Sequence, residues 1–134
     1  MFAIDANVVV RYLTQDHQEL AAKADVIIEG VEDGRLVVFC DPITLSEVVF
    51  VLASRYRLGR TEIANALEPI VSMDGFVVPD KDRYVRALDL YGTTVSHFGD
   101  ACACAAALEN CEGRLLSFDK GLSDVEGVQR AEEL

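Results

Sequence analysis

The sequence predicts an α/β fold, a three-layer sandwich in which a central, mostly parallel sheet of four or five strands is flanked by helices. Short apolar runs alternate along the chain with segments of helical periodicity, which is the pattern of repeated βαβ units. The chain has 134 residues, of which 51% are apolar, so it is long enough to bury one core and too apolar for intrinsic disorder. We therefore expect residues 1–134 to form a single domain.

Strands are expected where a short apolar run ends at an acidic or turn-forming residue. Asp5 ends the first run, and Asp41-Pro42 breaks the second. The expected strands are residues 2–5, 36–40, 76–78, 115–118 and, at an edge of the sheet, 125–128.

Helices are expected where apolar residues recur with a period near 3.6. Asn7 is a candidate cap for the first helix, and Thr44 with Glu47 has the spacing of a capping box. Gly59 and Gly92 are expected to end helices. The expected helices are residues 7–13, 18–32, 44–57, 61–73, 80–91 and 98–111.

The charge of the chain is strongly negative, with a formal net charge of −11. Taken alone, this charge argues against nucleic acid, because phosphate binding depends on Lys and Arg. Total charge does not fix the sign of the field at one face, however. Basic residues gather in two places, at Arg55, Arg57 and Arg60, and at Lys81, Arg83 and Arg86.

The chain shows no sign of membrane insertion or export. No apolar run approaches the roughly 20 residues of a membrane span, and the N-terminus lacks the basic and apolar regions of a signal peptide. A cytoplasmic location is the resulting expectation. The cysteines lack the CxxC spacing of a structural zinc site and are expected to be buried apolar thiols; they are Cys40, Cys102, Cys104 and Cys111.

Four carboxylates are the candidate functional residues: Asp5, Glu47, Asp100 and Asp119. Two end predicted strands and two fall in the first turns of predicted helices. In an open α/β sheet the functional cleft lies outside the carboxyl ends of the strands, so these side chains are expected to converge there. Converging carboxylates repel each other unless a cation lies between them, and hard oxygen ligands suit Mg²⁺ or Mn²⁺. Such a metal suggests phosphodiester chemistry.

Each acid also has a purely structural interpretation. An acid near a helix start is commonly a cap or a partner of the helix dipole. Glu47 is then only half of the capping box, and Asp100 is only favourable first-turn charge. The four positions taken together favour a metal site over four separate caps.

Several other polar residues are candidates for supporting roles. Asn7 either orients a water or a carboxylate or simply caps a helix. Ser117 precedes Asp119 by two residues, so in a strand both point to one side. Arg11 either reaches a phosphate or is solvated. His97 is expected to start a helix rather than act as a general acid, and Asp124 is expected to lie in a loop.

Four segments of the chain together resemble the PIN domain family, and within it the VapC-type toxins of bacterial toxin–antitoxin pairs. The similar segments follow the family's order and spacing over essentially the whole chain. They are residues 2–13 (FAIDANVVVRYL), 46–52 (SEVVFVL), 98–101 (FGDA) with the alanine-rich stretch after it, and 117–122 (SFDKGL). Ala6 departs from the pattern, because the family often has Thr or Ser there.

The resemblance implies a Mg²⁺- or Mn²⁺-dependent ribonuclease that forms homodimers and is blocked by a cognate antitoxin. It assigns direct or water-mediated metal binding to Asp5, Asp100 and Asp119, with Glu47 completing the acidic ring. The metal would polarise the phosphoryl oxygens and lower the pKa of an attacking water. RNA would be drawn in by Arg11 and the basic clusters.

Two other functions compete with this interpretation. A phosphoryl-transfer or receiver protein would use an aspartate nucleophile, although it usually has a second acid close to the first, which residues 5–7 lack. A protein-interaction module would keep only a vestigial acidic pocket.

The helices at 44–57 and 61–72 carry more apolar positions than one sheet face easily covers. Either the two helices pack on each other, or they also form a two-fold interface and a groove for an antitoxin helix. The positions are Val48, Val51, Leu52, Ile63, Ala64 and Leu67.

Overall fold

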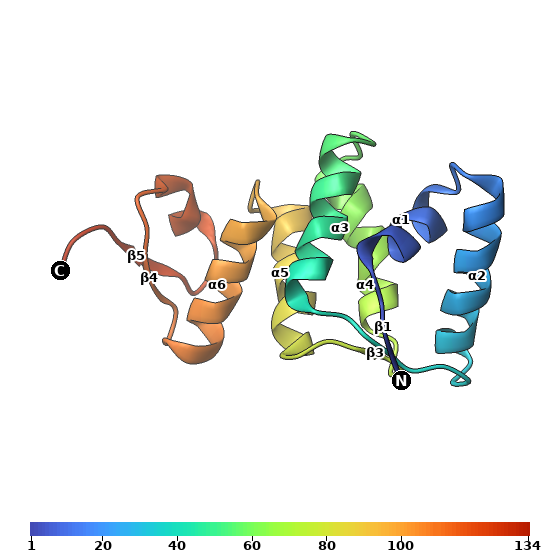
Figure 1. The fold of residues 1–134 in the computed structure, drawn as a ribbon. Helices are drawn as coiled ribbons and strands as arrows, with labels where there is room; N and C mark the ends of the chain where they lie inside the picture. Colours follow the sequence, from blue (N-terminus) through green and yellow to red (C-terminus); the bar gives the residue numbers. More distant parts are fainter.

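A computed structural model describes residues 1–134 and confirms the expected class, since parallel strands are flanked by helices (Figure 1). In chain order the elements are β1 (Phe2–Ala3), α1 (Ala6–Thr14), α2 (Gln18–Glu32), β2 (Val38–Phe39), α3 (Pro42–Ser54), α4 (Arg60–Val71), β3 (Phe76–Val77), α5 (Lys81–Thr93), α6 (Phe98–Asn110), β4 (Arg114–Leu116), the 3₁₀ helix η1 (Lys120–Asp124) and β5 (Gln129–Ala131). None of the helices combines the length and the apolar character that a membrane span requires.

The strands form two separate parallel sheets rather than one sheet of four or five strands. β1, β2 and β3 make a three-stranded sheet with β2 in the centre, and β4 pairs only with β5. Figure 1 shows β4 and β5 at the end of the molecule that carries the C-terminus, with α5 and α6 between them and β1. The alternation of strands and helices predicted the strands but not which strands are neighbours.

Two helix caps differ from the expectation. Asp5, not Asn7, caps α1, and its Oδ1 accepts a hydrogen bond from the Ala6 backbone N–H at 2.7 Å. Asp41 caps α3 by accepting from the Ile43 N–H at 2.8 Å, with proline at the first helical position. Proline suits that position because its missing N–H would have no helical partner there. α3 therefore begins two residues before Thr44, and the predicted capping box is wrong.

Gly92 is the next-to-last residue of α5, which ends at Thr93, one residue after the glycine that was expected to end it. A Cβ at Gly92 would lie 2.7 Å from the Cβ of Ala64 in α4. The glycine therefore allows α4 and α5 to approach closely, which is a packing role in addition to its place near the helix end.

The last strand is also displaced from the expected position. Val125 is buried near α6 instead of forming a strand with residues 126–128, and β5 begins at Gln129. Leu122 of η1 and Val125 belong to the hydrophobic core, and Val128 packs against it.

Most of the apolar positions on α3 and α4 are buried inside the protomer. Five of them are less than 5% exposed, and Val51 is half-buried; the five are Val48, Leu52, Ile63, Ala64 and Leu67. Packing between α3, α4 and their neighbours accounts for these positions, so they supply no separate reason to expect an interface on these helices.

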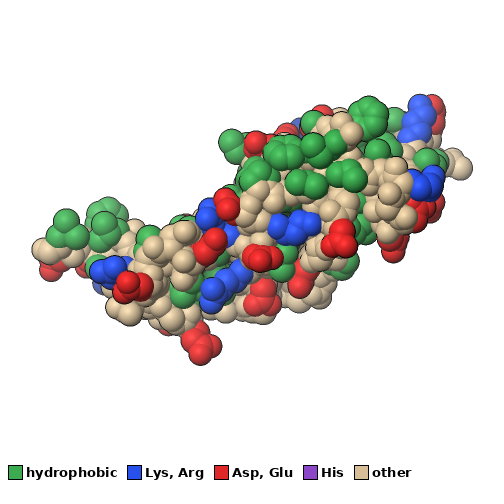
Figure 2. All heavy atoms as spheres, turned by 90° about the horizontal axis from the view of Figure 1, so that it is seen from below, with side chains coloured by type: hydrophobic (Ala, Val, Ile, Leu, Met, Phe, Trp, Pro, Cys, Tyr) green, Lys and Arg blue, Asp and Glu red, His purple; other side chains and the backbone are tan.

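The molecule is elongated. Its accessible surface is 7897 Å², whereas a compact monomer of 14.7 kDa exposes about 6,900 Å². The view from below shows hydrophobic side chains grouped over the middle of the molecule and again at the end near the C-terminal strands (Figure 2). The most exposed large apolar residues include Met1, Phe2, Leu116 and Phe118.

Asp16 links the end of α1 to the segment that follows α3 through side-chain hydrogen bonds. Its carboxylate accepts hydrogen bonds from Arg11 at 2.8 Å, from Thr14 at 2.9 Å and from the hydroxyl of Tyr56. These donors, first Tyr56 and then Arg11, hold the pKa of Asp16 well below its ordinary value. A depressed pKa means that the carboxylate stabilises the fold above the unfolded-state pKa of about 4, and that this contribution is lost as the pH falls below it.

We therefore expect Asp16→Asn to lower the melting temperature at pH 7, and the difference from wild type to shrink as the pH falls below about 4. Thermal unfolding of both proteins between pH 7 and pH 3 measures this. Asp74→Asn is the control, because Asp74 is exposed and forms no ion pair or side-chain hydrogen bond. A difference for Asp16→Asn that stays constant with pH would contradict the assignment.

Candidate functional site

Asp5 and Glu47 occupy the part of the molecule built on the three-stranded sheet. Asp5 lies two residues beyond the end of β1 and is exposed, as expected for an acid at a strand end. Glu47 lies in the second turn of α3, is exposed, and forms no hydrogen bond or ion pair. Because Asp41 caps α3, the capping explanation of Glu47 no longer applies, and its carboxylate is free to take a ligand.

Asp100 and Asp119 occupy the other part of the molecule, around α6. Asp100 lies in the first turn of α6, and Asp119 caps η1 by accepting from the Gly121 N–H at 2.9 Å. Burial first, and then the negative charges of Asp100 and Asp119, raise the pKa of the Cys104 thiol. Both carboxylates therefore lie on the side of α6 that carries Cys104.

The structure does not bring the four acids into one group. No three His, Cys, Asp or Glu side chains lie close enough together to hold a metal ion. The donor chemistry suits Mg²⁺, but its arrangement in one protomer does not. The expected convergence required all strands to share one sheet, and β4 is not in the sheet of β1. The ligand roles of the four acids therefore stay a prediction.

The three supporting residues are held by local structure. Asn7 and Arg11 line a hollow between α1 and α2, and Arg11 is paired with Asp16 at 2.8 Å. Ser117 lies beyond the end of β4, where its Oγ accepts from the Asp119 N–H at 3.0 Å. Ser117 thus fixes the backbone of Asp119, whereas Arg11 reaches a phosphate only by leaving Asp16.

One of the two basic clusters is free to bind anions. Arg55, Arg57 and Arg60 surround the connection between α3 and α4, are exposed, and form no ion pair. In the second cluster Arg83 is paired with Glu109 at 2.7 Å, and the Lys81 amine donates to a backbone carbonyl. The first cluster is therefore the stronger candidate for phosphate contacts.

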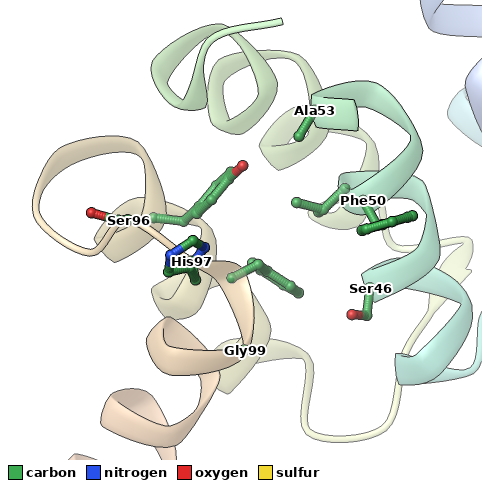
Figure 3. A pocket seen from close by; sticks show the side chains of 9 residues that line it. Ser46, Phe50, Ala53, Ser96, His97 and Gly99 are labelled. Atoms are coloured by element: carbon green, nitrogen blue, oxygen red, sulfur yellow. The ribbon is translucent and has the colours of Figure 1, made fainter. Parts of the chain in front are cut away.

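A cavity of about 240 Å³ lies between α3 and the start of α6 (Figure 3). Phe50 and Ser46 line it from α3, and His97 and Gly99 line it from the other side. His97 precedes α6 as its N-terminal cap residue, which confirms its expected position, but its side chain makes no capping bond. Sequence reasoning did not identify Phe50 as a lining residue, because its 69% exposure is visible only in the structure.

The cysteines show no metal-binding arrangement. All four are free thiols; Cys40 and Cys104 are buried and Cys102 is half-buried, but Cys111 is exposed, so the expectation of a buried thiol is wrong for Cys111. Burial raises the pKa of Cys40 and of Cys102 to about 11 each, so both remain protonated at neutral pH.

The sequence model of the PIN domain matches residues 2–128, which is nearly the whole chain and includes all four acids. The chain belongs to the PIN domain family. PIN domains are generally nucleases that use Mg²⁺ or Mn²⁺. A comparison with curated proteins found no significant match to the chain.

Proposed function

We propose that this PIN protein is a single-domain, metal-dependent endoribonuclease and the toxin of a VapC-type toxin–antitoxin pair. The observation that carries the proposal is the match to the PIN family over residues 2–128, a range that contains Asp5, Glu47, Asp100 and Asp119. The similarity of residues 2–13 and 117–122 to VapC-type toxins supports the narrower assignment.

The proposed site consists of Asp5, Glu47, Asp100 and Asp119. Asp5, Asp100 and Asp119 bind Mg²⁺ or Mn²⁺, and Glu47 completes the acidic ring. Carboxylate oxygens are the ligands that these hard cations prefer. When bound, such a metal supplies Lewis-acid activation of a phosphodiester.

The proposed substrate is RNA, contacted through its phosphates by Arg55, Arg57 and Arg60. These three are exposed and unpaired in a chain whose other cations are mostly paired with acids. Electrostatic contacts of this kind are released by salt, so affinity for RNA is expected to fall as salt rises. The net charge of −11 makes a local cluster necessary for such binding.

Metal binding is expected to stabilise the folded protein. Mn²⁺ at ten times its dissociation constant would add about 1.4 kcal/mol, which raises the melting temperature by roughly 5 °C. Thermal unfolding with and without Mn²⁺ measures the shift, and cleavage of RNA in the same buffers measures activity. Cleavage that survives EDTA would contradict a metal-dependent nuclease.

The proposed protein partner is an antitoxin encoded beside this chain. Co-purification with that gene product is expected to suppress RNA cleavage, and removal of the partner to restore it. The measurement is the cleavage rate of the complex and of the separated toxin with Mn²⁺ present. Equal rates in both would refute the toxin–antitoxin assignment while leaving the nuclease assignment standing.

A non-catalytic interaction module is the second candidate, because one protomer brings no three acids together. Such a module would keep its fold and its partner. It would show neither metal-dependent stabilisation nor cleavage, so the experiment with Mn²⁺ also separates these two functions.

A further inference from the structure

The sheet that contains β1 ends in an open edge. In the pairing with β2, the N–H groups of Phe2 and Ile4 donate to Val37 and Phe39 at 3.2 and 2.9 Å. Successive residues of a strand direct their backbone groups to opposite sides. The N–H and C=O of Ala3 therefore point away from β2, toward the side where no strand lies.

The sheet that contains β4 ends in a second open edge. Ser117 donates to Ala131 at 3.0 Å and Gln129 donates to Gly113 at 2.8 Å, so residues 113, 115 and 117 face β5. The backbone groups of Leu116 point the other way, where β4 has no neighbour. This two-stranded sheet packs on α6, and its outer edge at Leu116 has no partner strand.

Exposed apolar side chains distinguish the edges at β1 and β4 from the outer edge at β5. Met1 and Phe2 at β1 are 80% and 70% exposed, and Leu116 and Phe118 at β4 are 64% and 86% exposed. The outer strand β5 instead carries Gln129 and Arg130. An apolar hollow of about 390 Å³ also runs beside β1. Open edges with exposed apolar residues are templates for pairing with another strand.

We propose that β4 of one copy of this chain pairs in parallel with β1 of a second copy, and that the exchange is reciprocal. The outward-pointing groups allow the register in which the Ala3 N–H donates to the Leu116 carbonyl and the Phe118 N–H donates to the Ala3 carbonyl. Ala3 then lies opposite Ser117, and Asp5 lies opposite Asp119. Each half of the dimer becomes a five-stranded parallel sheet in the order β3-β2-β1-β4-β5.

The chain's own β4 is held away from β1, so in this proposal a second copy supplies the strand that pairs with β1. α6 is fixed along α5 by the pair between Arg83 and Glu109 at 2.7 Å and by the edge-to-face contact of Tyr91 with Phe98. Ala101, Cys104 and Ala105 on α6 are fully buried. Closure within one chain would separate α6 from α5 and expose these residues.

The surface area agrees with this exchange. Each protomer exposes about 1,000 Å² more than a compact chain of its mass. Two protomers together thus have about 2,000 Å² to bury, which is the upper part of the range for a stable interface.

The exchange also completes the site, and this consequence rests on the proposed nuclease function. Asp5 and Glu47 come from one copy, and Asp100 and Asp119 come from the other. The pairing brings the carboxyl ends of β1 and β4 side by side, where neighbouring strands are about 4.8 Å apart. The failure of a single protomer to group three acids is the result expected if the site lies between copies.

Disulfide formation between the two copies tests the alignment of Ala3 with Ser117 independently of nuclease activity. Two single variants, Ala3→Cys and Ser117→Cys, are made in a Cys111→Ser background, which removes the exposed native thiol. Neighbouring strands lie within the Cα separation of about 4.4–6.8 Å that a disulfide spans. Mixing the two variants, allowing exchange and then oxidising them is expected to give a covalent dimer, because each chain carries only one partner of the bond.

The control mixes Ala3→Cys with Ala131→Cys. Ala131 lies on β5, one strand further from β1 and beyond disulfide range, so no covalent dimer is expected. Light scattering of the unmodified protein provides a second readout, with an expected mass of twice 14.7 kDa. A monomeric mass, or no cross-link in the mixture of the two variants, would overturn the proposal. A ladder of higher masses would overturn the closed dimer.

Complementation separates this proposal from the proposed function. Asp5→Asn and Asp119→Asn are each expected to be inactive, but a mixture at equal amounts forms mixed dimers with one intact site. With random exchange about a quarter of all sites are intact, so cleavage is expected to return to about a quarter of the wild-type rate. If the disulfide-linked dimer forms but the wild-type protein cleaves no RNA, the proposed nuclease function is refuted and the proposed strand exchange stands. If the wild-type protein cleaves RNA but neither cross-linking nor complementation is observed, the proposed strand exchange is refuted and the nuclease function stands.

Discussion

Asp5→Asn, Asp100→Asn and Asp119→Asn are each expected to abolish metal-dependent RNA cleavage. A neutral amide is a poor ligand for a hard cation, so each change weakens the proposed metal site directly. Loss of a residue that only supports a ligand costs about 10–100-fold in metal affinity or activity. Loss of a direct ligand is expected to cost more than about 10–100-fold in activity. The cleavage rates of the three variants are therefore expected to lie near the rate measured without enzyme. The measurement is the single-turnover cleavage rate with Mn²⁺ present.

The fold of these variants is expected to persist. Asp5 and Asp119 cap α1 and η1, and asparagine caps helices about as well as aspartate does. Asp100 is part-exposed and forms no hydrogen bond or ion pair. Asp124→Asn is the matched control, because Asp124 is an exposed acid at the end of η1 outside the proposed ligand set. If all three ligand variants cleave RNA at the wild-type rate, the assignment of these residues to the metal site is wrong.

Gly113→Ala is expected to cause the largest loss of stability. Gly113 is buried with φ +82°, and a Cβ there would lie 1.9 Å from the carbonyl oxygen of Gly127. That contact is with backbone, so relief requires the start of β4 to move away from the turn that leads into β5. Clashes of this kind belong to the small class of changes that cost more than about 3 kcal/mol. The free energy of unfolding, from urea titration, measures the effect.

Gly34→Ala is the control for Gly113→Ala. Gly34 has nearly the same backbone conformation, with φ +83°, but nothing lies within 4 Å of its Cβ position. It is expected to cost only the conformational penalty of about 1–2 kcal/mol. Equal losses for the two variants would show that the contact with Gly127 contributes nothing.

The positions of the elements followed from the sequence because periodicity is a local signal. The apolar run before Asp5 and the run before Asp119 became β1 and β4, although both strands are shorter than expected. The sequence was a weaker guide for residues whose type fits more than one local structure. Asp41-Pro42 was interpreted as a strand breaker but forms the start of α3, and Gly92, next to the last residue of α5, also serves helix packing.

The arrangement of the candidate site could not be predicted in the same way. Acids at element ends identify Asp5, Glu47, Asp100 and Asp119, because that signal is again local. Whether they meet depends on which strand lies beside β1, and this is decided by the packing of α6 on α5 rather than by any motif. The cavity at Phe50 and His97 likewise depends on how two distant helices pack.

Sequencing of RNA ends after induced expression tests the central claim most directly, because it reads the cleavage products themselves. Wild-type protein is compared with Asp5→Ala at matched expression levels. We predict new RNA ends at one or a few defined sites in cells with the wild-type protein, and their absence in cells with Asp5→Ala. Identical RNA-end profiles for the two proteins would contradict a ribonuclease whose site includes Asp5.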